Sequence, residues 1–355
     1  MSVITIIGAG AMGTAIGYPA RENGNEVRLV GTPLDREIID CARSTGRHLK
    51  LKSKRGIPEG CKYYQTEQTR EALDGADLLV SGVSSFGVRW FLENVFPLIP
   101  DSLPVLCVTK GMHDTKDGRL VPYPHLYADA LKDRRLSINA VGGPCTSYEL
   151  ADHDPSTVCF CGDDMATLRR IKSMFETDYY HISLSCDVMG VECVSAMKNA
   201  YALGVTQAVG IAERRGGEGA IHYNSQAALF GQSLREMSKM LEICGGGAEN
   251  MVWGAGDLYV TIYGGRTRRI GILLGRGLST REALEMMGGD TLESLVIAGN
   301  AANALRKMIE LGKASESDFP LLLQIDALIN RGAGADIPWK AFVTESARES
   351  GERFR

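Results

Sequence analysis

The sequence lacks the features that mark membrane proteins and nucleic-acid-binding proteins. No apolar run reaches the roughly 18 residues that a membrane-spanning helix needs, and no basic residues precede the apolar stretch at the N-terminus, which glycines soon interrupt. A net charge of -4 leaves no general basic surface for nucleic acid or anionic membranes. We therefore expect a cytoplasmic globular protein with no membrane insertion and no nucleic-acid partner.

Paired cysteines and clustered histidines are also missing. The nine cysteines are an odd number without the spacing of a disulfide framework, and the six histidines are scattered along the chain. Cys159 and Cys161 alternate as in a strand, which points both thiols to one face. We expect reduced, buried thiols and no metal site.

Glycine is plentiful, and six residues near the start form a GxGxxG pattern, Gly8-Ala9-Gly10-Ala11-Met12-Gly13. A strand-like run at 3–7 leads into it, and a helix-like segment at 14–23 and a second strand-like run at 26–30 follow. Strand, glycine turn, helix and strand in this order predict a dinucleotide-binding site. An ordinary strand-turn-helix with small residues for packing is the alternative.

Each glycine of the pattern has a separate expected role. Gly8 permits a tight turn, Gly10 lets the backbone approach a pyrophosphate, and Gly13 allows close packing of helix and strand. The start of the helix, at Ala11 and Met12, would present free N–H groups to the anion.

The end of the second strand leaves the choice between NAD and NADP open. A carboxylate at this place accepts from the ribose 2′-hydroxyl of NAD, whereas a basic residue accommodates the 2′-phosphate of NADP. The sequence here is Gly31-Thr32-Pro33, which has no carboxylate. Asp35 lies slightly beyond the expected position, and Arg36 follows it. We take Thr32 as the expected cofactor contact and NAD as the expected cofactor, with NADP as the alternative.

The order of elements predicts two domains, in line with a length of 355 residues. Strand-like runs alternate with helical stretches up to about Cys186, which predicts an α/β fold with a doubly wound, mostly parallel sheet. We expect a Rossmann-like dinucleotide-binding domain over 1–187, an all-helical substrate-binding domain over 188–345 and a charged tail over 346–355. The predicted strands are 3–7, 27–30, 77–83, 104–109, 137–141, 157–161 and 181–184, and the predicted long helices are 188–213, 220–244, 280–287 and 292–311.

A lysine interrupts the apolar face of the first long helix. Val191, Val194, Lys198 and Tyr201 share one face by helical spacing. Burial would disfavour the ammonium form of Lys198 and lower its pKa toward values useful for proton transfer. The alternative, which helix geometry alone favours, is a side chain that carries its charged head out to water. Asn199 next to it adds an amide that also needs partners.

Strand ends supply further candidates. Lys110 follows the strand-like run at 105–109, which places it at the carboxyl edge of the predicted sheet, where doubly wound folds bind ligands. Ser84 and Phe86 follow the run at 77–83 in the same way. Phe86 would pack against a nicotinamide ring or join the core, and Lys110 is equally consistent with a solvated strand end.

Charged residues also lie next to glycines in the helical region. Asp257 and Thr261 follow what we interpret as a flexible turn. Arg266, Arg268 and Arg269 lie at a glycine-rich bend, and arginine is suited to bidentate capture of a phosphate. A surface charge cluster at the start of a helix is the alternative.

Together these motifs resemble NAD-dependent glycerol-3-phosphate dehydrogenase. The resemblance runs from about residue 3 to beyond residue 300, and it rests on GAGAMG, VTKG, GGPCTSYELA, SAMKNAYALGVTQAVGIAE, GAGDLYVT and YGGRTRR in the family's order and spacing. It implies a cleft between a Rossmann domain and a helical substrate domain, and a homodimer. The implied reaction is hydride transfer between the nicotinamide and C2 of dihydroxyacetone phosphate, a small phosphorylated ketone.

The resemblance also implies roles for single residues. Lys198 matches the family's catalytic lysine, and its ammonium would donate a proton to the alkoxide that forms when the ketone is reduced. Arg266 matches an arginine that meets both the substrate phosphate and the cofactor. The implied catalytic residues are Lys198, Lys110 and Asp257, and the implied substrate-binding residues are Asn199, Thr261, Arg266 and Thr267.

Departures from the family pattern leave the substrate open. Thr267 stands where the family usually has Asn, and Ala298 stands where it has Glu or Gln before a glycine, so we expect a cofactor contact to be missing. Ser84 occupies the usual proline position, and the long loop at 111–127 would reshape the pocket. The alternatives are another polyol phosphate, a 2-hydroxy acid as in ketopantoate reductases and opine dehydrogenases, and a non-catalytic dinucleotide sensor.

Overall fold

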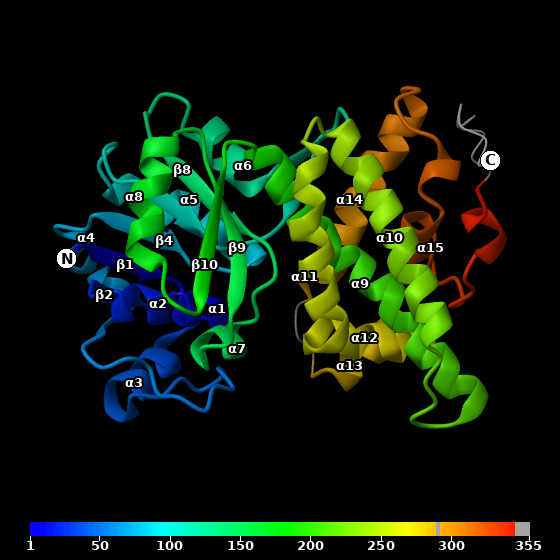
Figure 1. Ribbon diagram of the computed structural model, residues 1–355, viewed down its shortest axis with the longest axis horizontal. Helices are drawn as coiled ribbons and strands as arrows, with labels where there is room; N and C mark the ends of the chain where they lie inside the picture. Colours follow the sequence, from blue (N-terminus) through cyan, green and yellow to red (C-terminus); the bar gives the residue numbers. More distant parts are fainter. Residues whose placement is uncertain (289–291, 345–355) are drawn as a thin grey trace, which may run out of the picture.

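The structure, a computed structural model, describes residues 1–288 and 292–344. Figure 1 shows strands with flanking helices on its left and long helices on its right. This is the predicted α/β architecture with a helical second region. Residue 345 and the predicted tail at 346–355 lie outside the described residues.

Within the described residues, eight strands form one sheet in the order β10-β9-β8-β5-β4-β1-β2-β3. All neighbours pair parallel except β8 and β9, so the sheet is mostly parallel, as predicted. The chain proceeds from β1 to one side and returns to β4 on the other, which creates a topological switch point between β1 and β4. The strands are β1 (Val3–Ile7), β2 (Glu26–Val30), β3 (Lys62–Tyr64), β4 (Leu78–Ser81), β5 (Val105–Cys107), β8 (Ile138–Gly142), β9 (Ser156–Cys161) and β10 (Tyr180–Ser185).

Three short strands were not predicted. One is β3 at the edge of the sheet, and the other two, β6 (Met112–Asp114) and β7 (Leu120–Pro122), form an antiparallel hairpin. The hairpin and the start of helix α6 (Tyr123–Ala130) occupy the segment 111–127, so the prediction of a loop there is wrong. Strands of three residues are too short to show an alternating pattern in the sequence.

Short helices flank the sheet, and long helices form the second region. The predicted helix at 14–23 is two helices that meet at Ile16. The helices around the sheet are α1 (Ala11–Ala15), α2 (Gly17–Glu22), α3 (Arg36–Thr45), α4 (Thr69–Leu73), α5 (Val88–Asn94), α6, α7 (Ser147–Ala151) and α8 (Met165–Phe175). The second region contains α9 (Val188–Gly216), α10 (Tyr223–Ile243), α11 (Met251–Tyr263), α12 (Gly265–Gly275), α13 (Thr280–Met286), α14 (Glu293–Glu310) and α15 (Pro320–Asn330).

The prediction of a flexible turn before Asp257 is wrong, because this segment forms helix α11. Asp257 and Thr261 lie in the interior of this helix and do not follow a flexible turn. The glycines that suggested a turn serve packing, because a Cβ on Gly254 would lie 2.6 Å from the side chain of Val194 on α9. The chain turns only after α11, where Gly265 has a φ of +79° at the start of α12.

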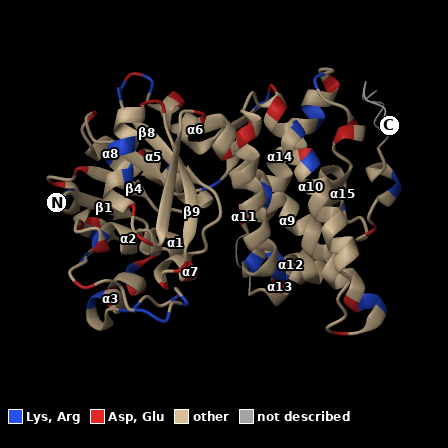
Figure 2. Cartoon of the chain, in the orientation of Figure 1, with Lys and Arg blue, Asp and Glu red and all other residues tan. Residues whose placement is uncertain are grey.

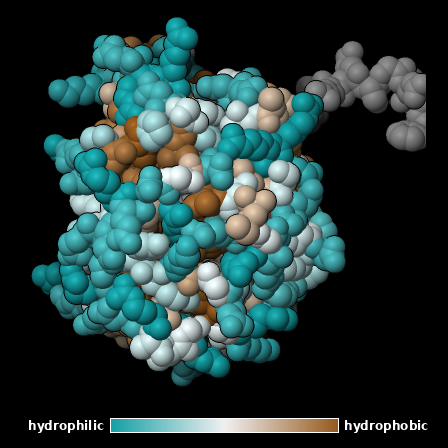
Figure 3. All heavy atoms as spheres, turned by 90° about the vertical axis from the view of Figure 1, so that its left-hand side faces the viewer, coloured by the Kyte–Doolittle hydropathy of each residue, from teal (hydrophilic) through white to brown (hydrophobic). Residues whose placement is uncertain are grey.

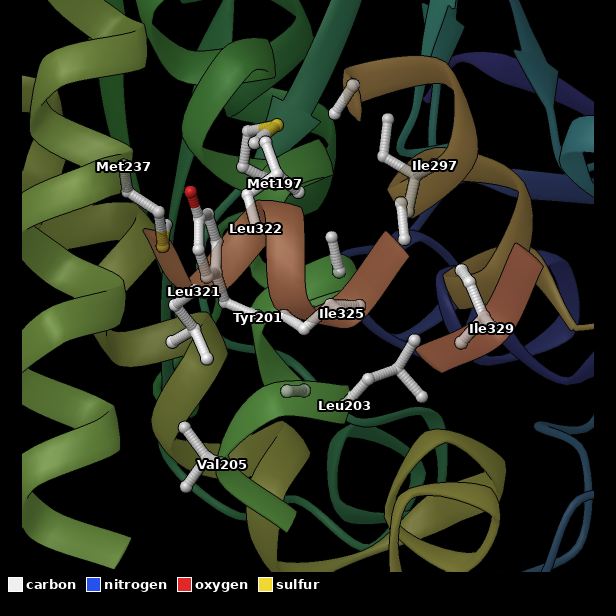
Figure 4. Close-up of a cluster of buried hydrophobic side chains, with 14 of the residues drawn as sticks. Met197, Tyr201, Leu203, Val205, Met237, Ile297, Leu321, Leu322, Ile325 and Ile329 are labelled. Atoms are coloured by element: carbon white, nitrogen blue, oxygen red, sulfur yellow. The ribbon is translucent and has the colours of Figure 1, made fainter. Parts of the chain in front are cut away.

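The two regions share their cores. In Figure 4, Tyr201 and Leu203 of α9 pack with residues of α15 in the helical core. Met112 and Leu120 of the β6–β7 hairpin belong to that helical core, while Val191 of α9 belongs to the core beneath the sheet. The sheet region and the helical region therefore interlock through the hairpin and the first turns of α9.

The surface carries no dominant charge. Figure 2 shows Lys and Arg interspersed with Asp and Glu on both regions, and Figure 3 shows a mostly hydrophilic face with small apolar areas on the sheet side. No helix among the described residues has both the length and the apolar character needed to cross a membrane. The nine cysteines are free thiols, and Cys186 among them is exposed.

Candidate functional site

The glycine-rich turn after β1 packs tightly against the protein on one side and is open on the other. Gly8 has a φ of +111°, and a Cβ there would lie 2.5 Å from the backbone of Gly82, just after β4. A Cβ on Gly13 would lie 2.1 Å from the carbonyl oxygen of Gly8, whereas a Cβ on Gly10 would meet nothing within 4 Å. Because Gly10 caps α1 and faces open space, the turn has the shape of a cradle for a pyrophosphate at a helix N-terminus.

Ala11 and Met12 form the first turn of α1 beside this opening. Asp35 lies just beyond the end of β2, where the ribose of a dinucleotide is expected. Its side chain reaches back to the glycine-rich turn, although its position in the sequence suggested that it lies too far along the chain. Its Oδ2 accepts from the backbone N–H of Ala9 at 3.2 Å and from the hydroxyl of Thr32 at 2.7 Å. Asp35 therefore brings a carboxylate to the place where the sequence alone indicated none.

His48 holds the same turn from another loop. Its Nδ1 accepts from two backbone N–H groups at 2.8 and 2.9 Å, which assigns the ring proton to Nε2. Nε2 then donates to the carbonyl oxygen of Ala9 at 2.7 Å. Burial lowers the pKa of His48, so the ring is neutral at physiological pH. The glycine-rich turn is thus fixed by two side chains before any ligand binds.

The loop after β4 lies at the same edge of the sheet. Ser84 begins a short 3-10 turn, Ser85–Gly87, in which Phe86 is 50% exposed. The ring of Phe86 therefore does not join the core and is accessible to a ligand. The backbone N–H of Ser85 donates to Oε1 of Glu293 at 2.8 Å, which links this loop to helix α14.

Lys198 points into a cluster between α9 and α11. Its Nζ lies 2.8 Å from Oδ1 of Asp257 and donates to the hydroxyl of Thr261 at 2.8 Å. The side chain is only 11% exposed, so the alternative of a charged head in open water is wrong. Asn199, also half-buried, lies next to Lys198 on α9.

Lys110 reaches the same carboxylate from the sheet region. Its Nζ lies 2.5 Å from Oδ2 of Asp257 and donates to the carbonyl oxygen of Gly143 at 2.8 Å. Asp257 is 1% exposed, so one buried carboxylate bridges two ammonium groups from different regions. Two cations and one anion leave a net positive charge, which suits an anionic ligand.

Asp187 positions the two helices that carry this cluster. As the N-cap of α9, it accepts from the backbone N–H of Gly190 at 2.7 Å. Its other oxygen accepts from the backbone N–H of Gly247 at 2.7 Å and from the side chain of Asn250 at 2.6 Å, at the start of α11. One side chain thus fixes the start of α9 relative to the start of α11.

Burial controls protonation at the site. Burial lowers the pKa of Lys198, and the Asp257 carboxylate opposes this effect. Glu192, earlier on α9, is fully buried, and burial raises its pKa to about 8, opposed by the positive charge of Lys110. Glu192 is therefore neutral at pH 7 and does not compete with Asp257 for the lysines.

The three arginines after α11 have different partners. Arg268 donates to the carbonyl oxygen of Ile262 at 2.6 Å, and Arg269 donates to that of Met286 at 2.9 Å. These bonds hold the two side chains against helix ends and occupy only part of each guanidinium, so an anion site at the three arginines stays a prediction. Arg266 is exposed and Thr267 is half-buried, both in the first turn of α12.

Two of the departures noted in the sequence lie away from the glycine-rich turn. Ala298 is fully buried in the helical core, so this position of α14 faces the core. The hairpin packs on the same helix, where Asn300 donates to the carbonyl oxygen of Met112 at 3.0 Å. The segment 111–127 therefore contributes to the joint between the regions.

The structure brings Lys110, Lys198, Asp257 and Thr261 together, as the motifs suggested. Glu192, Glu293 and the contact of Asp35 with the glycine-rich turn were not predicted from the sequence. A signal existed for Asp35, since Thr-x-x-Asp at 32–35 is a spacing at which side chains bond nearby backbone groups. No local signal existed for Glu293, because its contact with Ser85 spans 208 residues.

Comparison with known proteins identifies relatives of this fold and site. Residues 3–168 match the family model of the NAD-dependent glycerol-3-phosphate dehydrogenase N-terminus, and residues 187–337 match that of its C-terminus. The chain is 33% identical to an NADP(+)-dependent glycerol-3-phosphate dehydrogenase of Archaeoglobus fulgidus, over 80% of this chain and 83% of that protein. It is 30% identical to a glycerol-3-phosphate dehydrogenase [NAD(P)+] of Koribacter versatilis, over 94% of each chain. Its fold matches the crystal structure of glycerol-3-phosphate dehydrogenase from Coxiella burnetii with a TM-score of 0.78 at 22% identity, covering 96% of this chain and 97% of that one.

Proposed function

Because the chain belongs to the NAD-dependent glycerol-3-phosphate dehydrogenase family, we propose that it interconverts dihydroxyacetone phosphate and sn-glycerol 3-phosphate with an NAD(P) cofactor. The observation that carries the proposal is the cluster in which Asp257 bridges Lys110 and Lys198. It joins Lys110 of the sheet region, where the dinucleotide would bind, to Lys198 of the helical region, where the substrate would bind.

In this proposal the residues around the glycine-rich turn hold the dinucleotide. Gly8 and Gly13 shape the turn, and Gly10, Ala11 and Met12 present its open side to the pyrophosphate. Thr32 would lie beside the ribose, and Ser84, Phe86 and Arg266 would face the nicotinamide half. The bound nicotinamide supplies or accepts the hydride, and the chain's own residues manage the proton.

Lys198 is the proposed general acid and base. Reduction of a ketone leaves negative charge on its oxygen, and an adjacent ammonium both stabilises that charge and donates a proton. Asp257 orients Lys198 and keeps it charged, and Lys110 adds a second positive charge. Asn199, Thr261, Arg266 and Thr267 are the proposed contacts to the substrate and its phosphate.

The first test measures the oxidation of NADH and NADPH on addition of dihydroxyacetone phosphate. We expect rapid oxidation with the phosphorylated ketone and little with unphosphorylated dihydroxyacetone. Lys198→Ala should lower kcat by about 10²- to 10⁴-fold while NADH still binds, the range for loss of one general acid. Turnover of a 2-oxo acid but not of the phosphorylated ketone would contradict the proposed substrate, and retained turnover in Lys198→Ala would contradict the role of the lysine.

Asp35 makes NAD the preferred cofactor in this proposal. Its carboxylate at the turn would accept from a ribose 2′-hydroxyl and repel a 2′-phosphate, and Arg36 pairs with Glu67 on the surface. We expect kcat/KM for NADH to exceed that for NADPH by about tenfold or more. Asp35→Asn should bring the two kcat/KM values closer together. The named NADP(+) dependence of the Archaeoglobus fulgidus relative makes this a discriminating test, since a preference for NADPH in the wild type would contradict it.

We further propose a cytoplasmic protein, as its composition indicates, that forms a homodimer, as the resemblance implies. Light scattering of the purified protein would give its mass in solution, and a monomer at micromolar concentration would contradict the dimer.

A further inference from the structure

The segment between β8 and α7 packs along helix α11 and so joins the sheet region to the helical region. A Cβ on Gly256, in the middle of α11, would lie 3.0 Å from the side chain of Pro144. A Cβ on Gly264, just after α11, would lie 3.7 Å from the hydroxyl oxygen of Tyr148. The segment therefore follows α11 toward its C-terminal end, and Figure 1 draws α7 opposite the lower end of α11.

Tyr148 carries a hydroxyl that has no hydrogen-bond partner in the part of the chain that the structure describes. It is the second residue of α7 and is 40% exposed. The neighbouring carboxylate does not use this hydroxyl, because Glu149 accepts from the hydroxyl of Thr146. Since a tyrosine hydroxyl can donate one hydrogen bond, that of Tyr148 is available to a ligand.

The turn that Tyr148 contacts leads into the residues proposed to hold the substrate phosphate. Arg266 and Thr267 lie in the first turn of α12, directly after Gly264 and Gly265. Gly264 is the N-cap of α12 and offers no side-chain acceptor to the first N–H groups of this helix. A phosphate has several strong acceptor oxygens, so it can accept from a guanidinium and from a tyrosine hydroxyl at the same time.

The helix that carries Tyr148 also packs on α1, the helix that begins at the glycine-rich turn. Ala11 of α1 and Ala151 of α7 meet in one small core with Tyr18. Two kinds of phosphoryl group would therefore bind on this side of the fold, the pyrophosphate of the dinucleotide and the phosphate of the substrate. The contact with Gly264 places the hydroxyl of Tyr148 at the start of α12, which favours the substrate phosphate.

We propose that Tyr148 is a substrate-binding residue whose hydroxyl donates to the substrate phosphate at the start of α12. The sheet region would then supply one contact to a phosphate that the helical region otherwise holds, so the complete phosphate site needs both regions. The inference rests on the function proposed above and adds a residue to the phosphate site.

Tyr148→Phe tests the proposal, because it removes the hydroxyl and keeps the ring. Tyr223→Phe is the matched control, since Tyr223 is an exposed tyrosine at the start of α10, which Figure 1 draws far from α7. For each protein, kcat/KM is measured with dihydroxyacetone phosphate and with unphosphorylated dihydroxyacetone. NADH affinity is measured by fluorescence, and the rise in Tm caused by inorganic phosphate is measured by calorimetry.

We expect Tyr148→Phe to lower kcat/KM for dihydroxyacetone phosphate by about tenfold, the loss of one hydrogen bond to a charged group, mainly through a higher KM. With unphosphorylated dihydroxyacetone, kcat/KM should stay within about twofold of wild type, because this ketone lacks the group that the hydroxyl binds. NADH affinity should be unchanged, and inorganic phosphate should raise Tm less than in wild type. Tyr223→Phe should match wild type in every measurement.

An unchanged kcat/KM for dihydroxyacetone phosphate in Tyr148→Phe would overturn the proposal, and so would an equal loss with both ketones. Weaker NADH binding with an unchanged response to phosphate would also overturn it, and would assign the hydroxyl to the pyrophosphate. If the wild-type protein reduced no ketone, the proposed function would fail. The response of Tm to inorganic phosphate would then still decide whether Tyr148 contributes to a phosphate site.

Discussion

Glu192 is a fully buried carboxyl group on α9 whose two oxygens have no hydrogen-bond partner among the described residues. An isolated buried carboxylate is unfavourable, so the group keeps its proton, and burial raises its pKa from 4.5 to about 8. The folded protein therefore holds a proton that the unfolded chain releases between these two values. A pKa raised in this way makes stability fall as pH rises.

The consequence is a testable pH dependence. The contribution of Glu192 to stability is complete below about pH 4.5 and is lost as pH rises toward 8, at about 1.4 kcal/mol for each pKa unit. Glu192→Gln places a neutral group of similar shape there, so its free energy of unfolding should exceed that of wild type by several kcal/mol at pH 8 and match it near pH 5. Urea denaturation of both proteins from pH 5 to 8 measures this difference.

The exposed Glu310 supplies the control, since Glu310→Gln should leave the difference from wild type flat over the same range. A flat difference for Glu192→Gln as well would show that the carboxyl finds water or a partner in solution.

At the scale of elements, one carboxylate joins α9, α10 and α15. Glu236 on α10 accepts from the backbone N–H groups of Leu321 and Leu322, at 2.7 and 2.9 Å, at the start of α15. It also accepts from the hydroxyl of Tyr201 on α9 at 3.0 Å and from the side chain of Gln232 at 2.9 Å. Figure 4 shows Tyr201 beside Leu321 and Leu322 in this part of the core.

Removing this carboxylate should loosen the attachment of α15. Glu236→Ala leaves four buried donors without their acceptor, so we expect a loss of about 3 kcal/mol or more in the free energy of unfolding. Glu242→Ala, at an exposed position on the same helix, should cost less than about 1 kcal/mol. Burial raises the pKa of Glu236 to about 7, so the comparison belongs at pH 8, where the group is ionised. Equal losses in the two variants, measured by urea denaturation at that pH, would contradict the joining role of Glu236.

Some helices, strands and site residues could be predicted from the sequence, and others could not. Elements that are buried on most sides, such as β1, β9 and α9, were located nearly to the residue, because burial makes their sequences apolar over almost their whole length. Helix α11 was not recognised because its glycines favour a turn locally, and only the close approach to Val194 makes them suitable for a helix. Motif order placed Lys110, Lys198 and Asp257 in one site, whereas Glu293 depends on a contact between distant segments that no local pattern reports.

At the scale of the whole molecule, the change from strands to helices near residue 187 is real, but it does not separate two cores. Met112 and Leu120 of the sheet region are buried in the helical core, and Val188 and Val191 of α9 are buried with the sheet. The buried pair of Lys110 and Asp257 adds a charged link between the regions. The division into domains 1–187 and 188–345 therefore stays a prediction, and these shared cores argue for one cooperative unit.

Cooperativity can be measured directly. We expect one calorimetric transition for the full chain, with calorimetric and van't Hoff enthalpies that agree, and NADH should shift that whole transition upward. A fragment of residues 1–187 should lack a cooperative transition, because each of Met112 and Leu120 would lose about 1.5 to 3 kcal/mol of burial on exposure to water. Two resolved transitions, of which NADH shifts only one, would contradict the shared core and support independent domains, since the ligand would then stabilise only the region that holds the glycine-rich turn.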